Sequence, residues 1–191
     1  MYNFIMKKLL WFGPATICLE WFGVIYLTLA YSFDSSLPIS QFLTANHQAR
    51  PFGIALFTVS AFSYGLFAIG LANQWRWAPY IAAISGVFFS LTAINPFKNG
   101  SFTFHDFSAF ISVILYLLMM IGIQIYSPAI RTNKAAKYLT ILLTLLICSE
   151  IFTMTVSRTV YAATEILVLI AIHAWTLLVF KDLMWPKDRI A

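Results

Sequence analysis

The sequence predicts an all-α integral membrane protein, a single domain built as a bundle of six transmembrane helices. Six apolar stretches of about 20 residues fill most of the 191-residue chain, and an α-helix of that length crosses a hydrocarbon core of ~30 Å. Hydrophobic residues make up 61% of the chain, charged residues make up only 10%, and the mean hydropathy is +0.82. A soluble domain carries about 25% charged residues. The apolar runs lack the alternation of β-barrel strands, so helices must satisfy the backbone in lipid.

The first predicted helix spans Leu9–Tyr31 and follows the pair Lys7 and Lys8. A signal peptide has a shorter apolar core of about 7–15 residues, and this helix also contains Glu20. We therefore expect it to remain uncleaved. Pro14 lies in its first turns, where loss of a backbone donor costs least.

The loop Phe33–Pro51 follows and is the longest connection in the chain. Its apolar residues predict a short helix that lies on the membrane surface, while the role of the loop stays open. These residues are Leu37, Ile39, Phe42 and Leu43.

The other five predicted helices are joined by short connections, which favour antiparallel neighbours. They are Phe52–Asn73, Ala78–Phe97, Phe107–Ser127, Tyr138–Ser157 and Val160–Phe180. Small residues are expected to let the second and third helices approach closely. The glycines among them are Gly53, Gly65, Gly70 and Gly86. Cys18 and Cys148 lie within helices and lack a CxxC spacing, so we interpret them as packing residues.

The lysines and arginines predict the orientation of the bundle. Nine of the twelve fall on one side if the helices alternate: Lys7, Lys8, Arg76, Arg131, Lys134, Lys137, Lys181, Lys187 and Arg189. Cationic residues beside spans are retained in the cytoplasm, so both termini are predicted to be cytoplasmic. Trp11, Trp75, Trp77 and Trp185 map to the same interface, where indole rings are favoured. The net charge of +5 then reflects topology and contact with the lipid bilayer, and no nucleic-acid partner is expected.

Three acidic residues lie inside predicted spans, and such residues are costly in lipid and often functional. They are Glu20, Glu150 and Glu165, and His173 lies deeper on the helix of Glu165. A second polar group gathers at the predicted outer rim. It comprises Asp34, His47, Arg50, Asn95, Lys98, His105, Asp106 and Arg158.

These residues predict a polar pocket that opens to the extracytoplasmic side. Its ligand-binding candidates are Glu20, Asn95, Glu150, Arg158 and Glu165. His105 and Asp106 are the catalytic candidates, as an acid/base pair at its outer lip. A histidine at a water interface can transfer protons near neutral pH.

Each of these residues also has a structural interpretation. Glu20 or Glu150 can be protonated and hydrogen-bonded to a neighbouring helix. Glu165 can pair with Arg158, and His173 can donate a hydrogen bond between helices. Asp106 can be the N-cap of the fourth helix.

Several chemistries are disfavoured, and we predict neither a metal nor a cofactor. The chain lacks HExxH, GxSxG and a phosphate-binding glycine loop. Its three histidines do not form pairs at matched depth, as haem ligation would need. Ceramidase-type lipid hydrolases have an HxxxH spacing that is absent here. The two halves do not match, which disfavours an inverted-repeat transporter.

Short motifs spread over roughly residues 9–180 resemble the prokaryotic membrane family called Domain of Unknown Function 998. They are PISQ at Pro38–Gln41, the stretch Ile94-Asn95-Pro96-Phe97, His105-Asp106 followed by Ala109, and Glu165 with Trp175 beyond it. The resemblance implies a six-helix fold in a prokaryotic inner membrane, and no activity. The family often has an arginine directly after the acid of the last helix. This chain has Ile166 there, which leaves Arg158 as the nearest substitute.

Two classes of function follow, with a third beside them. The first is binding or moving a small amphiphile or lipid through the polar pocket. The second is a membrane-embedded enzyme that acts on a lipid-linked substrate with His105 and Asp106. The third is a structural subunit of a membrane complex. The sequence names no ligand, reaction or oligomeric state.

Overall fold

The computed structural model describes residues 2–33, 38–95, 103–156 and 158–185, with side chains except at 2–3, 41, 44–45 and 150–159. Helices make up nearly all of this part of the chain, and it contains no strand. The helices are α1 (Tyr2–Leu9), α2 (Phe12–Tyr31), α3 (Ile39–Ala45), α4 (Arg50–Gly70), α5 (Ala78–Ile94), α6 (Phe104–Tyr126), α7 (Pro128–Arg131), α8 (Lys134–Val156) and α9 (Arg158–Met184).

Four helical segments of the described chain are long and apolar enough to cross a membrane. They are Phe4–Tyr31, Arg50–Gly70, Phe104–Tyr126 and Val160–Met184. Helix α5 is also apolar but has only 17 residues. The prediction of an all-α chain with several helices of membrane-spanning length is therefore confirmed.

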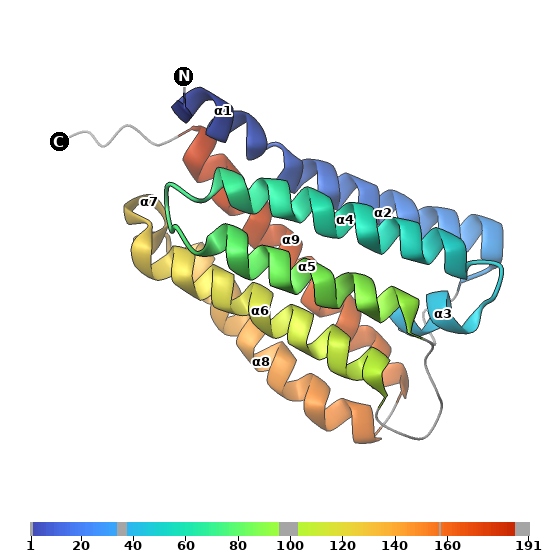
Figure 1. Ribbon diagram of the computed structural model, residues 1–191. Coiled ribbons are helices and arrows are strands. Elements are labelled where there is room, and N and C mark those ends of the chain that lie inside the picture. The colour runs from blue at the N-terminus through green and yellow to red at the C-terminus, as the bar shows by residue number, and fades with distance from the viewer. Residues whose placement is uncertain (1, 34–37, 96–102, 157, 186–191) are drawn as a thin grey trace.

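The long helices form a ring that follows the order of the chain. Each packs against the next, from α2 through α4, α5, α6 and α8 to α9, and α9 returns to pack against α2. Figure 1 shows the N-terminus, the connection from α4 to α5 and α7 at one end of the bundle, and α3 at the opposite end. The interior enclosed by this ring contains the candidate site.

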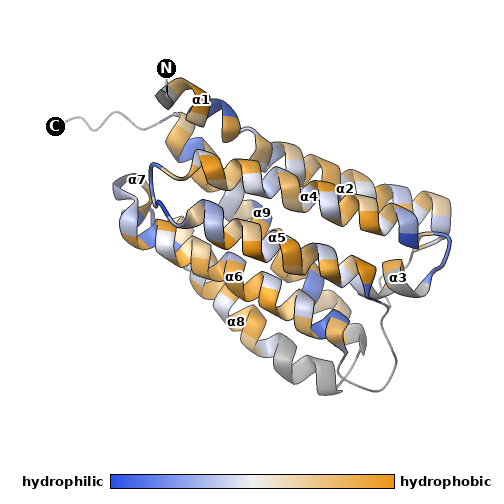
Figure 2. Cartoon of the chain, viewed as in Figure 1, coloured by the Kyte–Doolittle hydropathy of each residue, from blue (hydrophilic) through white to orange (hydrophobic). Residues whose placement is uncertain are grey.

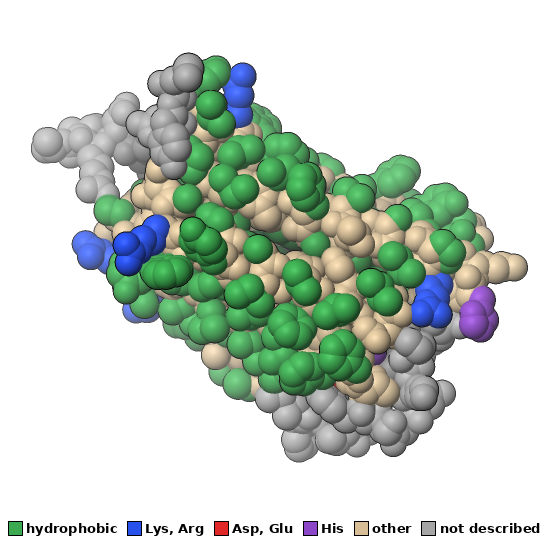
Figure 3. Space-filling view, in the orientation of Figure 1, with side chains coloured by type: hydrophobic (Ala, Val, Ile, Leu, Met, Phe, Trp, Pro, Cys, Tyr) green, Lys and Arg blue, Asp and Glu red, His purple; other side chains and the backbone are tan. Residues whose placement is uncertain are grey.

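Apolar side chains cover the outside of the bundle. Large hydrophobic residues such as Phe22, Leu29 and Phe62 are more than half exposed. Figure 2 shows hydrophobic residues along the helices, with hydrophilic ones gathered near the connections between them. On the face shown in Figure 3, the visible Lys and Arg side chains lie toward the two ends. This distribution suits a surface surrounded by lipid, with its charged groups at the two interfaces.

The first predicted helix, Leu9–Tyr31, corresponds to α2, which starts three residues later. Helix α1 ends at Leu9 and α2 begins at Phe12, with a turn between them. Pro14 has no N–H to donate to the carbonyl of Leu10, four residues earlier. Gly13 donates to that carbonyl instead, at 3.2 Å. Pro14 therefore lies in the first turn of α2, as expected, and its missing N–H accounts for the turn before that helix.

Helix α6 begins at Phe104, three residues before the predicted start. Thr103 is its N-cap, and its side chain accepts from the backbone N–H of Asp106. Asp106 in return accepts from the backbone N–H of Thr103 at 2.9 Å. This reciprocal arrangement is a capping box. The prediction that Asp106 is itself the N-cap is wrong by three residues.

Helix α5 ends at Ile94 because Asn95 precedes Pro96. A residue before proline is pushed away from helical geometry, and Asn95 is extended, with φ −87° and ψ 127°. The predicted end at Phe97 lies outside the described residues. At the other end of the bundle, α4 stops at Gly70 rather than Asn73, and α8 starts at Lys134 rather than Tyr138.

The glycines do not all serve the contact between α4 and α5. Only Gly86 does so, where a Cβ would lie 3.3 Å from the Cβ of Ala61. Gly53 faces Leu43 of α3, Gly70 faces the backbone of α1, and Gly65 has no other atom within 4 Å of its Cβ position. Close packing is therefore distributed over three different helix contacts.

Candidate functional site: an acidic cavity inside the bundle

A cavity of about 130 Å³ lies inside the ring of helices. Most of its wall is apolar, and three carboxyl groups, those of Glu20, Asp106 and Glu165, belong to that wall. The apolar lining comes chiefly from Val24, Leu56, Phe57, Phe89, Ala109, Phe110, Val113, Val168, Leu169 and Ile172. The site therefore combines an apolar interior with a strongly acidic edge.

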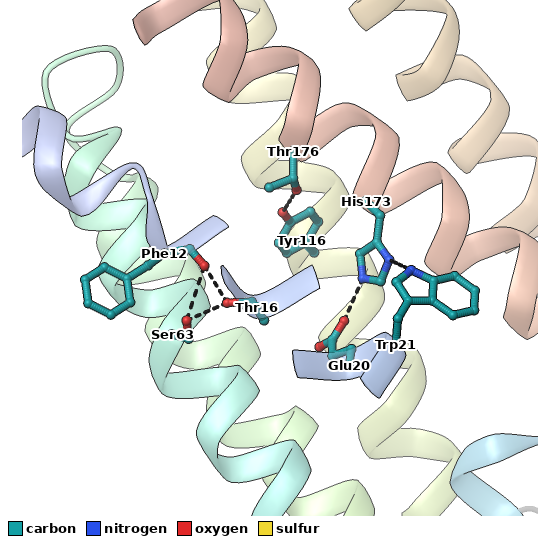
Figure 4. Close-up of polar contacts among 8 residues, drawn as sticks. All are labelled: Phe12, Thr16, Glu20, Trp21, Ser63, Tyr116, His173 and Thr176. Atoms are coloured by element: carbon teal, nitrogen blue, oxygen red, sulfur yellow. Dashed lines mark hydrogen bonds and ion pairs between the residues drawn. The ribbon is translucent and has the colours of Figure 1, made fainter. Parts of the chain in front are cut away.

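Glu20 enters the cavity from α2 and is held by α9. Its Oε2 lies 2.6 Å from Nε2 of His173, and both side chains are buried. Trp21 donates its indole N–H to Nδ1 of His173 at 3.0 Å. Because an indole N–H only donates, Nδ1 must accept, and the ring hydrogen belongs on Nε2. His173 is thus a neutral donor to Glu20, as Figure 4 lets the reader follow.

One oxygen of Glu20 remains after this contact. Oε1 is buried and has no hydrogen-bond partner among the described residues. In Figure 4 it lies on the side of the carboxyl group away from Trp21. Buried polar atoms without a partner are uncommon in proteins, and each calls for an explanation.

Asp106 repeats this pattern at the start of α6. Its Oδ2 accepts from the backbone N–H and the hydroxyl of Thr103, at 2.9 and 2.7 Å. Its Oδ1 is buried without a partner in the described part of the chain. The capping box therefore fixes the carboxyl group while it leaves one oxygen for another donor.

Glu165 uses its carboxyl group to hold α3. Oε2 accepts from the backbone N–H of Ile39 at 2.6 Å, and Oε1 accepts from that of Ser40 at 3.4 Å. These are the first two amides of α3, which have no partner inside a helix. Ile39 and Ser40 also line the cavity. Glu165 thus fixes a short helix across one end of the site.

A smaller hollow of about 70 Å³ continues from the cavity deeper into the bundle. Glu20, Phe89 and Val113 are among the residues that line both spaces. Its wall adds the hydroxyl groups of Tyr64, Ser85, Ser112 and Tyr116. Glu20 therefore stands where the acidic cavity meets a region of hydroxyl groups.

Buried hydroxyl groups join the helices around these spaces. Tyr116 of α6 bonds to Thr176 of α9 at 2.8 Å, and Thr16 of α2 lies 2.5 Å from the hydroxyl of Ser63 in α4. Figure 4 shows both pairs beside the Glu20 cluster. Hydrogen bonds of this kind stabilise helix association in lipid.

His105 and Asn95 occupy positions that differ from the expected ones. Nδ1 of His105 lies 2.8 Å from the backbone carbonyl oxygen of Thr92 and 3.2 Å from that of Asn95. His105 and Asp106 are both buried, at 1% and 3% exposure, so neither forms a water-facing lip. The amide of Asn95 donates to the carbonyl of Leu91 in its own helix, at 2.7 Å.

The side chains of the remaining candidates, Glu150 and Arg158, lie outside the described part of the structure, so their expected roles stay predictions. The described His, Cys, Asp and Glu residues include no group of three that could hold a metal ion.

The sequence interpretation found the three carboxyl groups but missed several residues around them. Thr103 and Ser40 donate to the carboxyl groups of Asp106 and Glu165, and Trp21 donates to His173, which bonds Glu20. Thr103 could have been found, because a threonine three residues before an acid is a capping-box signal. No sequence signal indicated Trp21 or Ser40, since both act on residues more than 100 positions away.

Comparison with known proteins adds no relative: no protein-family model, no curated protein and no solved structure matches this chain. The resemblance to the Domain of Unknown Function 998 family therefore stays a prediction.

Proposed function

We propose that this protein binds or moves a small amphiphile through the cavity that Glu20, Asp106 and Glu165 line. The observation that carries the proposal is the combination of an apolar cavity with buried carboxyl oxygens to which no described residue donates. Ligand sites are typically concave and apolar, with a few polar groups that fix the orientation of the ligand. We also propose six transmembrane helices, which adds α5 and α8 to the four long apolar segments.

The distribution of basic residues supports an orientation for this site. Lys7, Lys8, Arg76, Arg131, Lys134, Lys137 and Lys181 belong to the end of the bundle that carries α1, α7 and the last turn of α9. The rings of Trp11, Phe180 and Trp185 pack together at this end. The positive-inside tendency assigns this end to the cytoplasm, and the resemblance to the Domain of Unknown Function 998 family implies a prokaryotic inner membrane. The end with α3 then faces the extracytoplasmic side.

Ala109 offers a direct test, because its side chain lines the cavity. In Ala109→Phe the ring occupies space that a ligand would need. We expect native mass spectrometry of the gently purified wild type to show a retained small molecule, and the variant to lose most of it. Ala55→Phe is the control, since Ala55 is exposed on the outside of α4.

Equal retention in wild type and Ala109→Phe would contradict a ligand in this cavity. A wild-type spectrum with only loosely exchanging lipid would favour a structural subunit of a larger complex. The thermal unfolding midpoint of each variant, measured in the same detergent, shows whether the fold has survived the substitution.

A membrane enzyme that acts on a lipid-linked substrate is the second candidate. The observation that favours it is the free carboxyl oxygen of Asp106 at the cavity wall. A changed lipid product on overexpression, lost in Asp106→Asn, would support it. Retention of an unchanged molecule by an inactive protein would count against it.

A further inference from the structure

We propose that the ligand of this cavity is a cation: a compact apolar group that carries a positively charged, hydrogen-bond-donating nitrogen. The inference rests on the proposed function and names the chemical class that the site would take. Three features of the cavity support a cationic ligand: two free acceptor oxygens, the charge of the lining and the shape of the apolar wall.

The free oxygens are Oε1 of Glu20 and Oδ1 of Asp106. Both residues line the cavity, with exposures of 6% and 3%. In each carboxyl group the protein itself bonds the other oxygen, through His173 or Thr103. An ionised carboxylate oxygen only accepts hydrogen bonds, and no described residue donates to these two oxygens, so a ligand with a donor would satisfy them. Glu165 differs because α3 bonds both of its oxygens.

The described lining supplies no positive charge to balance these groups. It contains neither Lys nor Arg. His173 is neutral when its Nδ1 accepts from Trp21, and His105 directs Nδ1 to a backbone carbonyl of α5. A buried carboxylate without a compensating charge is costly. A cationic ligand compensates that charge with bonds of the strongest class, those between ionised partners.

The apolar wall limits the size and shape of the ligand. A cavity of about 150 Å³ lined by apolar residues holds one benzene molecule, and this cavity measures about 130 Å³. Phe57 and Phe89 line it with their rings stacked, 4.4 Å between centroids. Aromatic faces attract cations as well as apolar groups. One aromatic ring therefore fills the apolar part of the site, which is partly open, and a primary amine on a short arm from that ring is a suitable first probe.

Two matched probes separate the charge from the apolar body. 4-Fluorophenethylamine carries an ammonium group at neutral pH, and 2-(4-fluorophenyl)ethanol is its neutral counterpart. Fluorine-19 NMR measures the binding of each to the full chain in phosphatidylcholine nanodiscs, with empty nanodiscs as the baseline for partition into lipid. We expect saturable binding of the amine, at least about tenfold tighter than that of the alcohol.

Isosteric amides test the two oxygens separately. Glu20→Gln and Asp106→Asn each keep one oxygen to accept from His173 or Thr103, and replace the free oxygen with a donor NH₂. Each should weaken amine binding about tenfold and leave alcohol binding within the error of the measurement. Glu165→Gln should cause a smaller loss than either variant.

The outcomes distinguish this inference from the function on which it rests. Equal or tighter binding of the alcohol would overturn the cationic ligand, while the cavity would stand as an amphiphile site. Equal losses in all three acid variants would overturn the assignment to the two free oxygens. No saturable binding of either probe would overturn the inference. The proposed function is tested separately, by whether wild type retains a small molecule and Ala109→Phe loses it.

Discussion

Glu20 illustrates at the scale of one residue how an acidic side chain is accommodated in a membrane helix. Its carboxyl group points into the ring, where His173 donates to one oxygen and the cavity wall surrounds the other. Trp21, on the next position, fixes the tautomer that makes this bond possible. A group that orients a histidine through its second nitrogen is a recurring device at functional sites.

Gly70 and Gly65 both lie in α4, and only Gly70 has close neighbours where a Cβ would be added. At Gly70 an added Cβ would lie 3.0 Å from the backbone nitrogen of Leu10 and 3.1 Å from the carbonyl oxygen of Met6. We expect Gly70→Ala to lower the free energy of unfolding by about 1–3 kcal/mol, the usual cost of overpacking. Thermal unfolding in detergent, followed by circular dichroism, measures the change.

Gly65→Ala is the control, because nothing lies within 4 Å of the Cβ that it adds. Its effect should stay within about 1 kcal/mol in either direction. Similar midpoints for the two variants would show that α1 does not pack on α4 as described.

Single residues could be predicted from the sequence better than their partners. Glu20, Glu165 and His173 were all identified as buried polar groups in helices. Their bonding could not be derived, because it depends on which helices are neighbours. The sequence suggested Arg158 as a partner for Glu165 and did not indicate the backbone amides of α3. Free amides at the start of a short helix carry no sequence signature.

At the scale of the element, α3 is a short helix that contributes Ile39 and Ser40 to the cavity wall. Ile39 and Leu43 are buried, and the helix packs against both α4 and α5. The helix was predicted from the apolar residues of the loop. Its burial was not, since the same pattern also suits a helix that lies on a lipid surface.

Removal of the Glu165 carboxyl group should loosen α3. In Glu165→Leu the amides of Ile39 and Ser40 lose their acceptor, and a helix of 7 residues has little stability of its own. We expect faster hydrogen exchange over residues 38–45, measured by mass spectrometry in nanodiscs. Glu165→Gln retains a carbonyl oxygen and should exchange more slowly than the leucine variant.

Exchange in the leucine variant that matches wild type would mean that packing alone holds α3. Helix α4 serves as the internal reference, because its own amides do not depend on Glu165.

The helix boundaries show which local sequence signals were sufficient to predict where each helix begins and ends. Apolar runs located all the long helices, and errors arose where a single residue controlled the end. Pro14 set the start of α2, Pro96 ended α5, and Thr103 moved the start of α6 toward the N-terminus. Hydropathy does not report these effects, whereas proline and capping chemistry do.

At the scale of the whole molecule, the ring of helices in chain order creates one interior and one lipid-facing exterior. Hydropathy could predict that the helices associate, because each carries polar residues that need partners. It could not predict the ring, since any order of six similar helices satisfies the same pattern. The cavity is a property of that order, so only its acidic residues could be anticipated.

The proposed orientation can be tested in intact cells. Gln48 and Thr132 are exposed in connections at opposite ends of the bundle. In a background with Cys18→Ala and Cys148→Ala, we expect a membrane-impermeant maleimide to label Gln48→Cys and not Thr132→Cys. Labelling of both after permeabilisation is the control, and the reverse pattern in intact cells would place the termini outside.

The bonds that close the cavity also bear on how the protein is made. Glu20 and His173 are 153 positions apart, and Ile39 and Glu165 are 126 positions apart. Synthesis proceeds from the N-terminus, so α9 leaves the ribosome after α2 and α3. Until it enters the membrane, Glu20 has no imidazole beside it and α3 has no carboxyl group to hold it. A nascent chain that stops before α9 would therefore present an unsatisfied acid to lipid, a feature by which membrane proteases could recognise an unfinished product.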